Sequence, residues 1–207
     1  GNPDLGACQQ LSISRGSAEE VAASMEAAGL TMLRDDVSWS TYDTPEKKAE
    51  NLPALKERIN VLKEHGINFL ALLWNNAQKT MSDGGNVPST AEELDAWEEY
   101  CKMMASELKG YTDYFEIWNE YNINMFNTSN QPPEVYVELL KRAYRAIKAE
   151  NPNAVIIGGC PSEVDLVFLE NIFKLGALQY MDVVSVHPYD WTGQFREGRY
   201  VETMKAA

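Results

Sequence analysis

Four short segments of the chain place polar and aromatic residues directly after an apolar stretch. They are Arg34–Trp39, Trp74–Asn76, Trp118–Glu120 and His187–Tyr189. Carboxyl and imidazole groups such as those of Glu120 and His187 can transfer protons during catalysis. Aromatic rings can stack on a neutral polyhydroxylated ligand, while carboxylates and amides bind its hydroxyl groups. The alternative is that these residues simply end strands at the solvent-exposed surface.

Helical and strand patterns alternate along the chain from Ser17 onward. Ser17 and Glu20 form a capping box at the start of one helix, and Thr90 and Glu93 form another. The predicted strands are Leu5–Leu11, which has the weakest pattern, and Thr31–Val37, Asn68–Trp74, Tyr114–Trp118, Ala154–Gly159 and Asp182–Val186. The predicted helices fall within Ser17–Gly29, Leu52–Gly66, Thr90–Gly110, Pro132–Ile147 and Val164–Leu175.

This alternation predicts an α/β fold of parallel βαβ units with right-handed crossovers. The periodicity fits a doubly wound sheet and a closed barrel equally well. In both architectures the carboxyl ends of the strands share one rim, so the four polar segments are expected to converge there. No repeat, shift in composition or low-complexity segment marks a second domain, and the chain is treated as one unit.

The segment Phe115–Glu120, which reads Phe-Glu-Ile-Trp-Asn-Glu, resembles the fourth-strand motif of glycoside hydrolase clan A. Leu33–Trp39 is similar to the second strand of that clan and Val184–Tyr189 to its sixth, so the resemblance covers nearly the whole chain. Among the clan's families the sequence is most similar to family 39, which includes β-xylosidases, and next to the cellulase-like family 5. The resemblance implies a (β/α)8 TIM barrel, of which this chain would supply about the first six βα units.

The resemblance also implies retaining hydrolysis of β-glycosidic bonds in plant-type or related saccharides, with a xyloside or glucoside as substrate. Such hydrolysis uses one protonated carboxyl group to assist the leaving group and one carboxylate about 5–5.5 Å away as nucleophile. Glu120 matches the general acid/base. The substrate-binding residues carried over from the resemblance are Arg34, Asp36, Trp39, Trp74, Asn119, His187 and Tyr189. Asn119 would bind the sugar 2-hydroxyl group, and Arg34 would support the nucleophile.

Two further ionisable residues have less specific surroundings. Alternation places Glu116, Trp118 and Glu120 on one face of the strand, inside a barrel. Glu116 is either a second catalytic carboxyl group or a buried, hydrogen-bonded residue, and its depth below the rim favours the second interpretation. His65 lies at a helix end, where its cation would favour the helix dipole, and is not expected to be catalytic.

The chain departs from the clan pattern in two ways. Tyr121 stands where the family commonly has proline, which would leave the loop less constrained. The clan places its nucleophilic glutamate at the end of strand seven, and no residue here matches it. The last residue, Ala207, is expected to lie in the helix after strand six. Six strands would leave two unpaired edges. Residues 1–207 are therefore expected to form a single, incomplete catalytic domain with little or no turnover, completed by a missing C-terminal segment or another chain.

Composition narrows the range of partners. The net charge is −13 and the 18 basic residues are scattered, which disfavours nucleic acid. No apolar run is long enough to span a membrane, and the first residues lack a signal-peptide pattern, which leaves localisation open. Gly158 and Gly159 belong to neither nucleotide-binding glycine pattern, so no cofactor is expected. The three cysteines, Cys8, Cys101 and Cys160, are interpreted as buried thiols.

Two other functions remain open from the sequence. The first is a catalytically inactive carbohydrate-binding or scaffold protein that uses the same aromatic rim without a nucleophile. The second is a metal-dependent barrel enzyme with Asp35, Asp36, Glu120 and His187 as ligands. No compact histidine spacing supports a metal site, so no metal is expected.

Overall fold

The computed structural model describes residues 5–8, 16–76 and 78–189. These residues form a six-stranded sheet in the order β1-β2-β3-β4-β5-β6, in which all neighbouring strands are parallel. The strands are β1 (Gly6–Cys8), β2 (Met32–Ser38), β3 (Asn68–Trp74), β4 (Tyr114–Ile117), β5 (Val155–Ser162) and β6 (Val183–His187). The helices are α1 (Ala18–Ala27), η1 (Trp39–Thr41), α2 (Pro45–Glu64), α3 (Ala91–Glu107), α4 (Pro133–Glu150), α5 (Leu166–Lys174) and η2 (Ala177–Tyr180).

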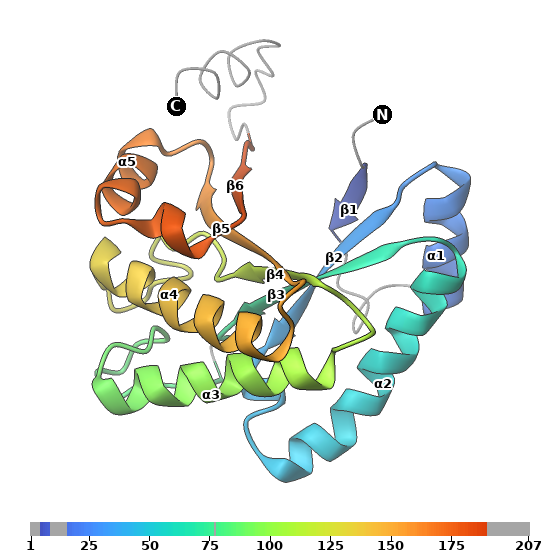
Figure 1. Cartoon of the computed structure of the whole chain (residues 1–207), viewed down its shortest axis with the longest axis horizontal. Helices are drawn as coiled ribbons and strands as arrows, with labels where there is room; N and C mark the ends of the chain where they lie inside the picture. Colours follow the sequence, from blue (N-terminus) through green and yellow to red (C-terminus); the bar gives the residue numbers. More distant parts are fainter. Residues whose placement is uncertain (1–4, 9–15, 77, 190–207) are drawn as a thin grey trace.

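The sheet is part of a (β/α)8 barrel and not a doubly wound sheet. Its strand order follows the chain without reversal, whereas a doubly wound sheet has a point at which the order reverses. The helices lie along the outer side of the curved sheet, and β1 and β6 form its two ends (Figure 1). The six parallel strands thus form a half-barrel, and the expectation of a partial TIM barrel is confirmed.

The local signals predicted the start of several helices. The capping box of α1 is formed, since Ser17 Oγ accepts a hydrogen bond from the backbone N–H of Glu20 at 3.2 Å and Glu20 accepts one from the backbone N–H of Ser17 at 2.8 Å. The capping box of α3 is formed as well. α2 begins earlier than expected, because Thr44 caps it and Pro45 suits the first turn. None of the helices in the described parts of the chain is both long and apolar enough to cross a membrane.

Two expectations about the ends of the chain fall partly or wholly outside the described residues, and one about the cysteines is wrong. Within the predicted strand Leu5–Leu11, β1 covers Gly6–Cys8, and residues 9–11 lie outside the described residues. The helix expected to run to Ala207 also lies outside them. Cys101 and Cys160 are buried, but the expectation that Cys8 is buried is wrong, because Cys8 lies exposed on the terminal strand β1.

Two apolar layers hold the half-barrel together. The larger layer lies between the sheet and the helices and includes a chain of aromatic contacts from Trp39 through Trp97 and Trp118 to Tyr121. The smaller layer is a separate cluster formed by Leu70, Ile157 and Cys160, with Met32, Tyr114 and Val155 packed against it. Burial of these side chains is the main force that orders the strands.

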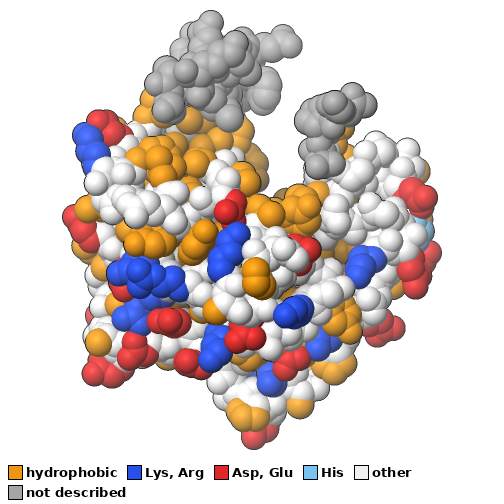
Figure 2. Space-filling model, in the orientation of Figure 1, with side chains coloured by type: hydrophobic (Ala, Val, Ile, Leu, Met, Phe, Trp, Pro, Cys, Tyr) orange, Lys and Arg blue, Asp and Glu red, His pale blue; other side chains and the backbone are white. Residues whose placement is uncertain are grey.

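Hydrophobic side chains gather over the part of the molecule that holds α5 and β6, on the face shown in Figure 2. The exposed apolar side chains of these elements and of the loop and turn between them are Leu166, Val167, Leu175, Leu178, Val183 and Val184. Among the described strands β6 pairs with β5 alone. An edge strand of this kind presents backbone groups with which a further strand can pair.

Candidate active site

Glu120 lies just beyond the carboxyl end of β4, at the rim of the half-barrel. Its backbone has a left-handed conformation with φ of 43°, and so has that of Trp118 with φ of 66°. The two left-handed residues interrupt the alternation of the strand. Trp118 therefore packs against Trp97 of α3, with ring centroids 5.7 Å apart, and the expectation that it shares the barrel-facing side with Glu116 and Glu120 is wrong.

Arg34 joins the second strand to the fourth. Residues 32–38 alternate strictly between half-buried and buried, which places Arg34 and Asp36 on the same face of β2. The guanidinium group of Arg34 donates a hydrogen bond from Nε to Glu116 and a second one, of 2.8 Å, from Nη2 to Asn119 Oδ1. The side chain of Glu116 is only 2% exposed. Glu116 is therefore a buried, hydrogen-bonded residue, as the preferred interpretation of the sequence predicted.

His187 at the end of β6 connects the two glutamates. Its Nδ1 lies 2.9 Å from Glu120 Oε1, and its Nε2 lies 3.8 Å from Glu116 Oε1. Tyr189 follows with its ring edge-on to the imidazole, at a centroid distance of 6.2 Å. Residues from β2, β4 and β6, far apart in the sequence, thus form one cluster of charged groups at the rim.

The charges in this cluster shift one another's protonation. Burial alone would raise the pKa of Glu116, but its bonds to His187 and Arg34 outweigh burial and lower that pKa to about 2. Burial opposes the charge of His187 as well, yet the two glutamates raise the pKa of the imidazole above its ordinary value. The pKa of Arg34 is likewise raised by Glu116 against the effect of burial. At neutral pH Glu116 is therefore a carboxylate paired with the cation of Arg34.

This pairing predicts a specific loss of stability in acid for the wild type relative to Glu116→Gln. Because the pKa of Glu116 is lowered in the folded state, its contribution is present above pH 4.5 and is lost as the pH falls towards 2. A change in pKa from 4.5 to about 2 corresponds to about 3 kcal/mol in the free energy of unfolding.

Urea unfolding between about pH 5 and pH 2 measures this effect. Other carboxyl groups titrate in both proteins, so the difference between the two pH curves isolates Glu116. The curve of the wild type should fall more steeply than that of Glu116→Gln and should run parallel to that of Glu57→Gln, whose substituted residue is exposed on α2. Parallel curves for the wild type and Glu116→Gln would contradict the assignment.

Trp74 and Trp39, the two tryptophans expected to bind the substrate, lie in different places. Trp74 ends β3, remains half-buried and meets Phe126 edge-on at a centroid distance of 5.4 Å. Trp39 is only 4% exposed and stacks on Tyr100 of α3 at 5.7 Å, on the helix side of the sheet. The structure thus brings together Arg34, Asn119, Glu120, His187 and Tyr189, and it does not bring Trp39 to them.

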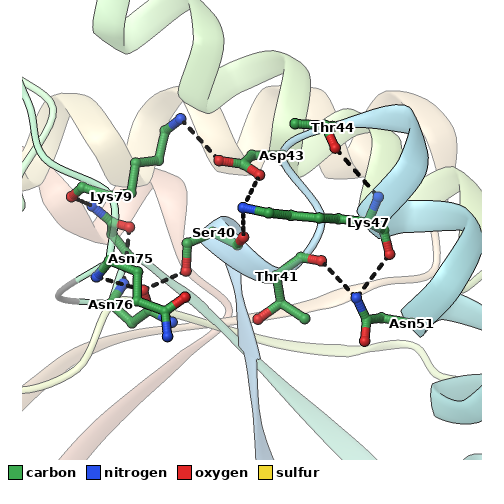
Figure 3. A network of polar contacts seen from close by, with 10 residues as sticks. Ser40, Thr41, Asp43, Thr44, Lys47, Asn51, Asn75, Asn76 and Lys79 are labelled. Carbon is green, nitrogen blue, oxygen red and sulfur yellow. Dashed lines mark hydrogen bonds and ion pairs between the residues drawn. The ribbon is translucent and has the colours of Figure 1, made fainter.

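The polar residues after β2 and β3 brace the loops of the rim (Figure 3). Asn75 is fully buried and donates hydrogen bonds to the backbone carbonyls of Lys79 at 2.9 Å and of Asn86 at 2.7 Å. Asn76 accepts a hydrogen bond from Ser40 of η1, the short helix that follows β2. The amide groups of both residues therefore hold backbone or neighbouring loops in place.

Tyr121, which stands where the family commonly has proline, is held by contacts of its side chain. Tyr121 is 2% exposed, and its ring packs between those of Tyr136 and Phe168 at centroid distances of 5.2 Å and 6.1 Å. Its hydroxyl group donates a hydrogen bond of 3.1 Å to the carbonyl oxygen of Pro132. Burial of the tyrosine ring anchors the loop where the family's proline would have restricted its backbone.

The residues weighed as metal ligands do not form a common site. Asp35 and Asp36 are neighbours on a strand and therefore face opposite sides of it. Within residues 5–8, 16–76 and 78–189, no group of three or more acidic, histidine or cysteine side chains is arranged to hold a metal ion.

The contacts that hold the backbone of Glu120 were not predicted. The N–H of Glu120 donates to the carbonyl oxygen of Cys160 at 2.9 Å, and the side chain of Asn122 binds Ser162. β5 was expected to end at Gly159 but continues to Ser162 through an irregularity in its pairing with β6. The adjacent glycines of β5 were a signal for this irregularity, because glycine inside a strand often marks a bulge.

A parallel βα half-barrel with ionisable groups gathered at the carboxyl ends of its strands has the architecture of the (β/α)8-barrel enzymes. Residues 7–203 match the cellulase family, glycosyl hydrolase family 5, and the chain belongs to this family. The resemblance to clan A is thereby confirmed, and the matching family is the second of the two named from the sequence.

Solved structures support the same fold. A family 39 glycoside hydrolase from Bacteroides cellulosilyticus WH2 is 22% identical over 90% of this chain, with a TM-score of 0.71. A family 39 β-xylosidase from Caulobacter crescentus is 20% identical over 99% of the chain, with a TM-score of 0.68. An exo-β-1,4-mannosidase from Opitutaceae bacterium strain TAV5 is 19% identical over 75%, with a TM-score of 0.63. The chain spans 38%, 50% and 31% of these proteins, respectively. The search of curated proteins finds no match.

Proposed function

We propose that this chain is the part of a retaining β-glycosidase that carries the general acid/base, and that Glu120 has this role. The observation that supports the proposal most directly is the position of the Glu120 carboxyl group. It lies at the carboxyl end of β4, where barrel enzymes hold their catalytic residues, and one of its oxygens is bound by His187 at 2.9 Å. Family membership supplies the class of reaction, hydrolysis of a glycosidic bond.

Glu116 in β4 and Glu120 just beyond it have different surroundings, which supports different roles. Glu116 is 2% exposed, and its charge is neutralised by Arg34. A carboxylate held in this way is a poor nucleophile, because attack on a sugar would require it to leave its cation and emerge from below the rim. We therefore assign the nucleophile to a carboxylate outside the six described strands, at the end of a seventh strand.

In the reaction we propose, Glu120 gives its proton to the glycosidic oxygen while the bond between that oxygen and the anomeric carbon breaks. The nucleophilic carboxylate forms a bond to the anomeric carbon, which gives a glycosyl ester. Water then attacks the same carbon, Glu120 takes the proton of the water, and the carboxylate leaves. The configuration at the anomeric carbon is inverted twice and is thus retained.

The neighbouring side chains have the groups that such a substrate needs. Asn119 Oδ1 accepts from Arg34 at 2.8 Å, which orients its amide so that Nδ2 can donate to a sugar hydroxyl group. Trp74 is the better candidate for a ring on which the sugar can stack, since Trp39 is buried against α3. Tyr189 is 52% exposed beside His187 and can contact a bound ring. We propose a β-xyloside or β-glucoside as the substrate.

We propose that the barrel must be complete for turnover, because among the described strands β6 pairs with β5 alone and has exposed apolar side chains around it. We therefore propose that residues 1–207 form a single catalytic domain that requires two further βα units.

The proposal is tested with a panel of nitrophenyl β-glycosides that includes the xyloside, glucoside and mannoside. Hydrolysis is measured for the 207-residue chain and for a chain extended to eight βα units, called here the complete barrel. We expect activity in the complete barrel and little or none in the shorter chain. Strong hydrolysis by the shorter chain that depends on Glu120 would contradict the need for two further units. Inactivity of both, with sugar binding unaffected by Glu120→Gln, would favour a binding protein.

A further inference from the structure

We propose that Asn122 is a positioning residue for Glu120, and that its amide group clamps the irregular part of β5 to which the backbone of Glu120 is bound. The inference rests on the proposed role of Glu120 as general acid/base. It adds a residue that lies outside the charged cluster and acts on the reaction only through the place of the Glu120 carboxyl group.

The backbone of Glu120 has an unfavourable conformation. A left-handed conformation with φ of 43° is unfavourable for a residue with a side chain, so contacts with the rest of the protein must hold it. The carbonyl group of Glu120 accepts a hydrogen bond of 3.1 Å from the N–H of Ile123 in its own loop, and the backbone contact with another strand is the hydrogen bond of 2.9 Å from the N–H of Glu120 to the carbonyl oxygen of Cys160. The direction of the Glu120 side chain therefore depends on where that carbonyl group lies.

The acceptor of this hydrogen bond, the carbonyl group of Cys160, itself lies on irregular backbone. Gly159 and Cys160 have φ values of 89° and 51°, and the pairing of β5 with β6 shifts register between Gly159 and Ser162. One end of this segment is fixed by Tyr136, whose hydroxyl oxygen accepts a hydrogen bond of 2.7 Å from the N–H of Gly159. The other end requires a separate contact.

Asn122 provides that contact. Its Oδ1 accepts a hydrogen bond of 2.8 Å from the N–H of Ser162, and its Nδ2 donates one of 3.2 Å to the carbonyl oxygen of the same residue. Nδ2 also donates to Asp165 Oδ2 at 3.0 Å, while Asp165 Oδ1 accepts from the N–H of Phe168 and caps α5. An amide side chain of this length both donates and accepts, which a carboxylate or an aliphatic side chain does not.

The contacts of Asn122 also hold the loop after β4, which carries Glu120, against the end of β5. Ser162 pairs with His187 in the register of β5 and β6, and the side chain of His187 binds Glu120 at 2.9 Å. Asn122 thus ties the loop that carries Glu120 to the strand segment that lies beside His187. Loss of the clamp should let the backbone of Ser162 and Cys160 move, and the Glu120 carboxyl group with it.

Three variants test this inference. Asn122→Ala removes all three hydrogen bonds, and Asn122→Asp keeps the acceptor for Ser162 but places a carboxylate against Asp165. The double variant Asn122→Asp/Asp165→Asn restores the contact between positions 122 and 165 with its polarity reversed, while the new asparagine can still cap α5. Asn60→Ala is the matched control, because Asn60 is exposed on α2.

The first readout is amide hydrogen exchange in the 207-residue chain, which does not depend on catalysis. We expect Asn122→Ala to speed exchange of the Ser162 and Glu120 amides about tenfold or more, the scale of losing one hydrogen bond. The double variant should restore part of the protection, and Asn60→Ala should change neither amide. Unchanged protection of the Glu120 amide in Asn122→Ala would overturn the inference, since that amide binds Cys160 and not Asn122.

The second readout is turnover by the complete barrel. Misplacement of a general acid should lower kcat/KM, which reports the step in which the leaving group departs, about tenfold or more for a poor leaving group and should have little effect on kcat/KM of a dinitrophenyl glycoside. Equal losses of kcat/KM for both leaving groups would indicate a purely structural role and would overturn the inference. If the wild-type complete barrel hydrolyses no glycoside, the proposed function fails, while hydrogen exchange still decides whether Asn122 holds Glu120.

Discussion

Replacing Glu120 with glutamine is expected to lower kcat/KM of the complete barrel on an alkyl β-glycoside by about 10²–10⁴-fold. Glutamine keeps the shape of the side chain and can still accept a hydrogen bond from His187, which lies 2.9 Å from Oε1 in the wild type. It has no proton to give to the glycosidic oxygen and cannot take one from water. The loss should therefore fall on the chemical steps and leave substrate binding nearly intact.

The leaving group separates this effect from general damage. A dinitrophenolate leaves without protonation, so its departure step should be slowed far less in Glu120→Gln than that of an alkyl alcohol. Glu57→Gln is the matched control, because Glu57 is exposed on α2 and should have the activity of the wild type. An equal loss for all leaving groups, or wild-type activity in Glu120→Gln, would refute the role assigned to Glu120.

Replacing Arg34 with methionine is expected to lower the free energy of unfolding by about 3–5 kcal/mol at neutral pH. The substitution leaves the carboxylate of Glu116, which is 2% exposed, without its cation and also removes the bond to Asn119. A buried carboxylate that has lost the guanidinium group and keeps only His187 Nε2, at 3.8 Å, is costly, whereas the length of methionine preserves most of the packing. Urea unfolding of the 207-residue chain measures the change.

A second substitution shows whether the uncompensated charge is the cause. The double variant Arg34→Met/Glu116→Leu should recover much of the lost stability, since an apolar pair can replace a buried ion pair at little cost. Lys174→Met removes the exposed ion pair with Glu170 and should have little effect. If the double variant is less stable than Arg34→Met alone, the account of the Arg34–Glu116 pair is wrong.

Much of the fold could be predicted because its signals are local. The capping boxes at Ser17 and Thr90 mark where α1 and α3 begin, and both are formed. The alternation of strands and helices predicts parallel βα units but not barrel closure, which depends on the strand order of the whole sheet. The family motif supplied that choice, and the observed strand order confirms it.

The positions of the tryptophans could not be predicted by counting residues along a strand. Alternation assumes an extended backbone, and the left-handed backbone of Trp118 turns its side chain towards the helices. Trp39 follows the end of β2 in η1, where strand alternation no longer applies, and packs on Tyr100. Both residues serve the core between sheet and helices, a result that only the tertiary contacts reveal.

The contacts that hold Glu120 and its loop could not be predicted either, because they join residues far apart in the sequence. Asn122 and Ser162 are 40 residues apart, and nothing near either residue in the sequence indicates that they meet. The burial of Tyr121 depends on Tyr136 and Phe168 from two different helices. The residue types of the site could thus be read from the sequence, whereas the contacts that hold them in place depend on the assembled sheet.

The most direct test of the central claim is the reaction of Glu120→Gln with azide in the complete barrel. Azide needs no general base, so it should attack the glycosyl ester in place of water, raise the rate and give a product of retained, β configuration. The account predicts a β-glycosyl azide, identified by NMR, together with a higher rate on a dinitrophenyl β-glycoside. An α-glycosyl azide would show that Glu120 is the nucleophile, and no response to azide would contradict its role as general acid/base.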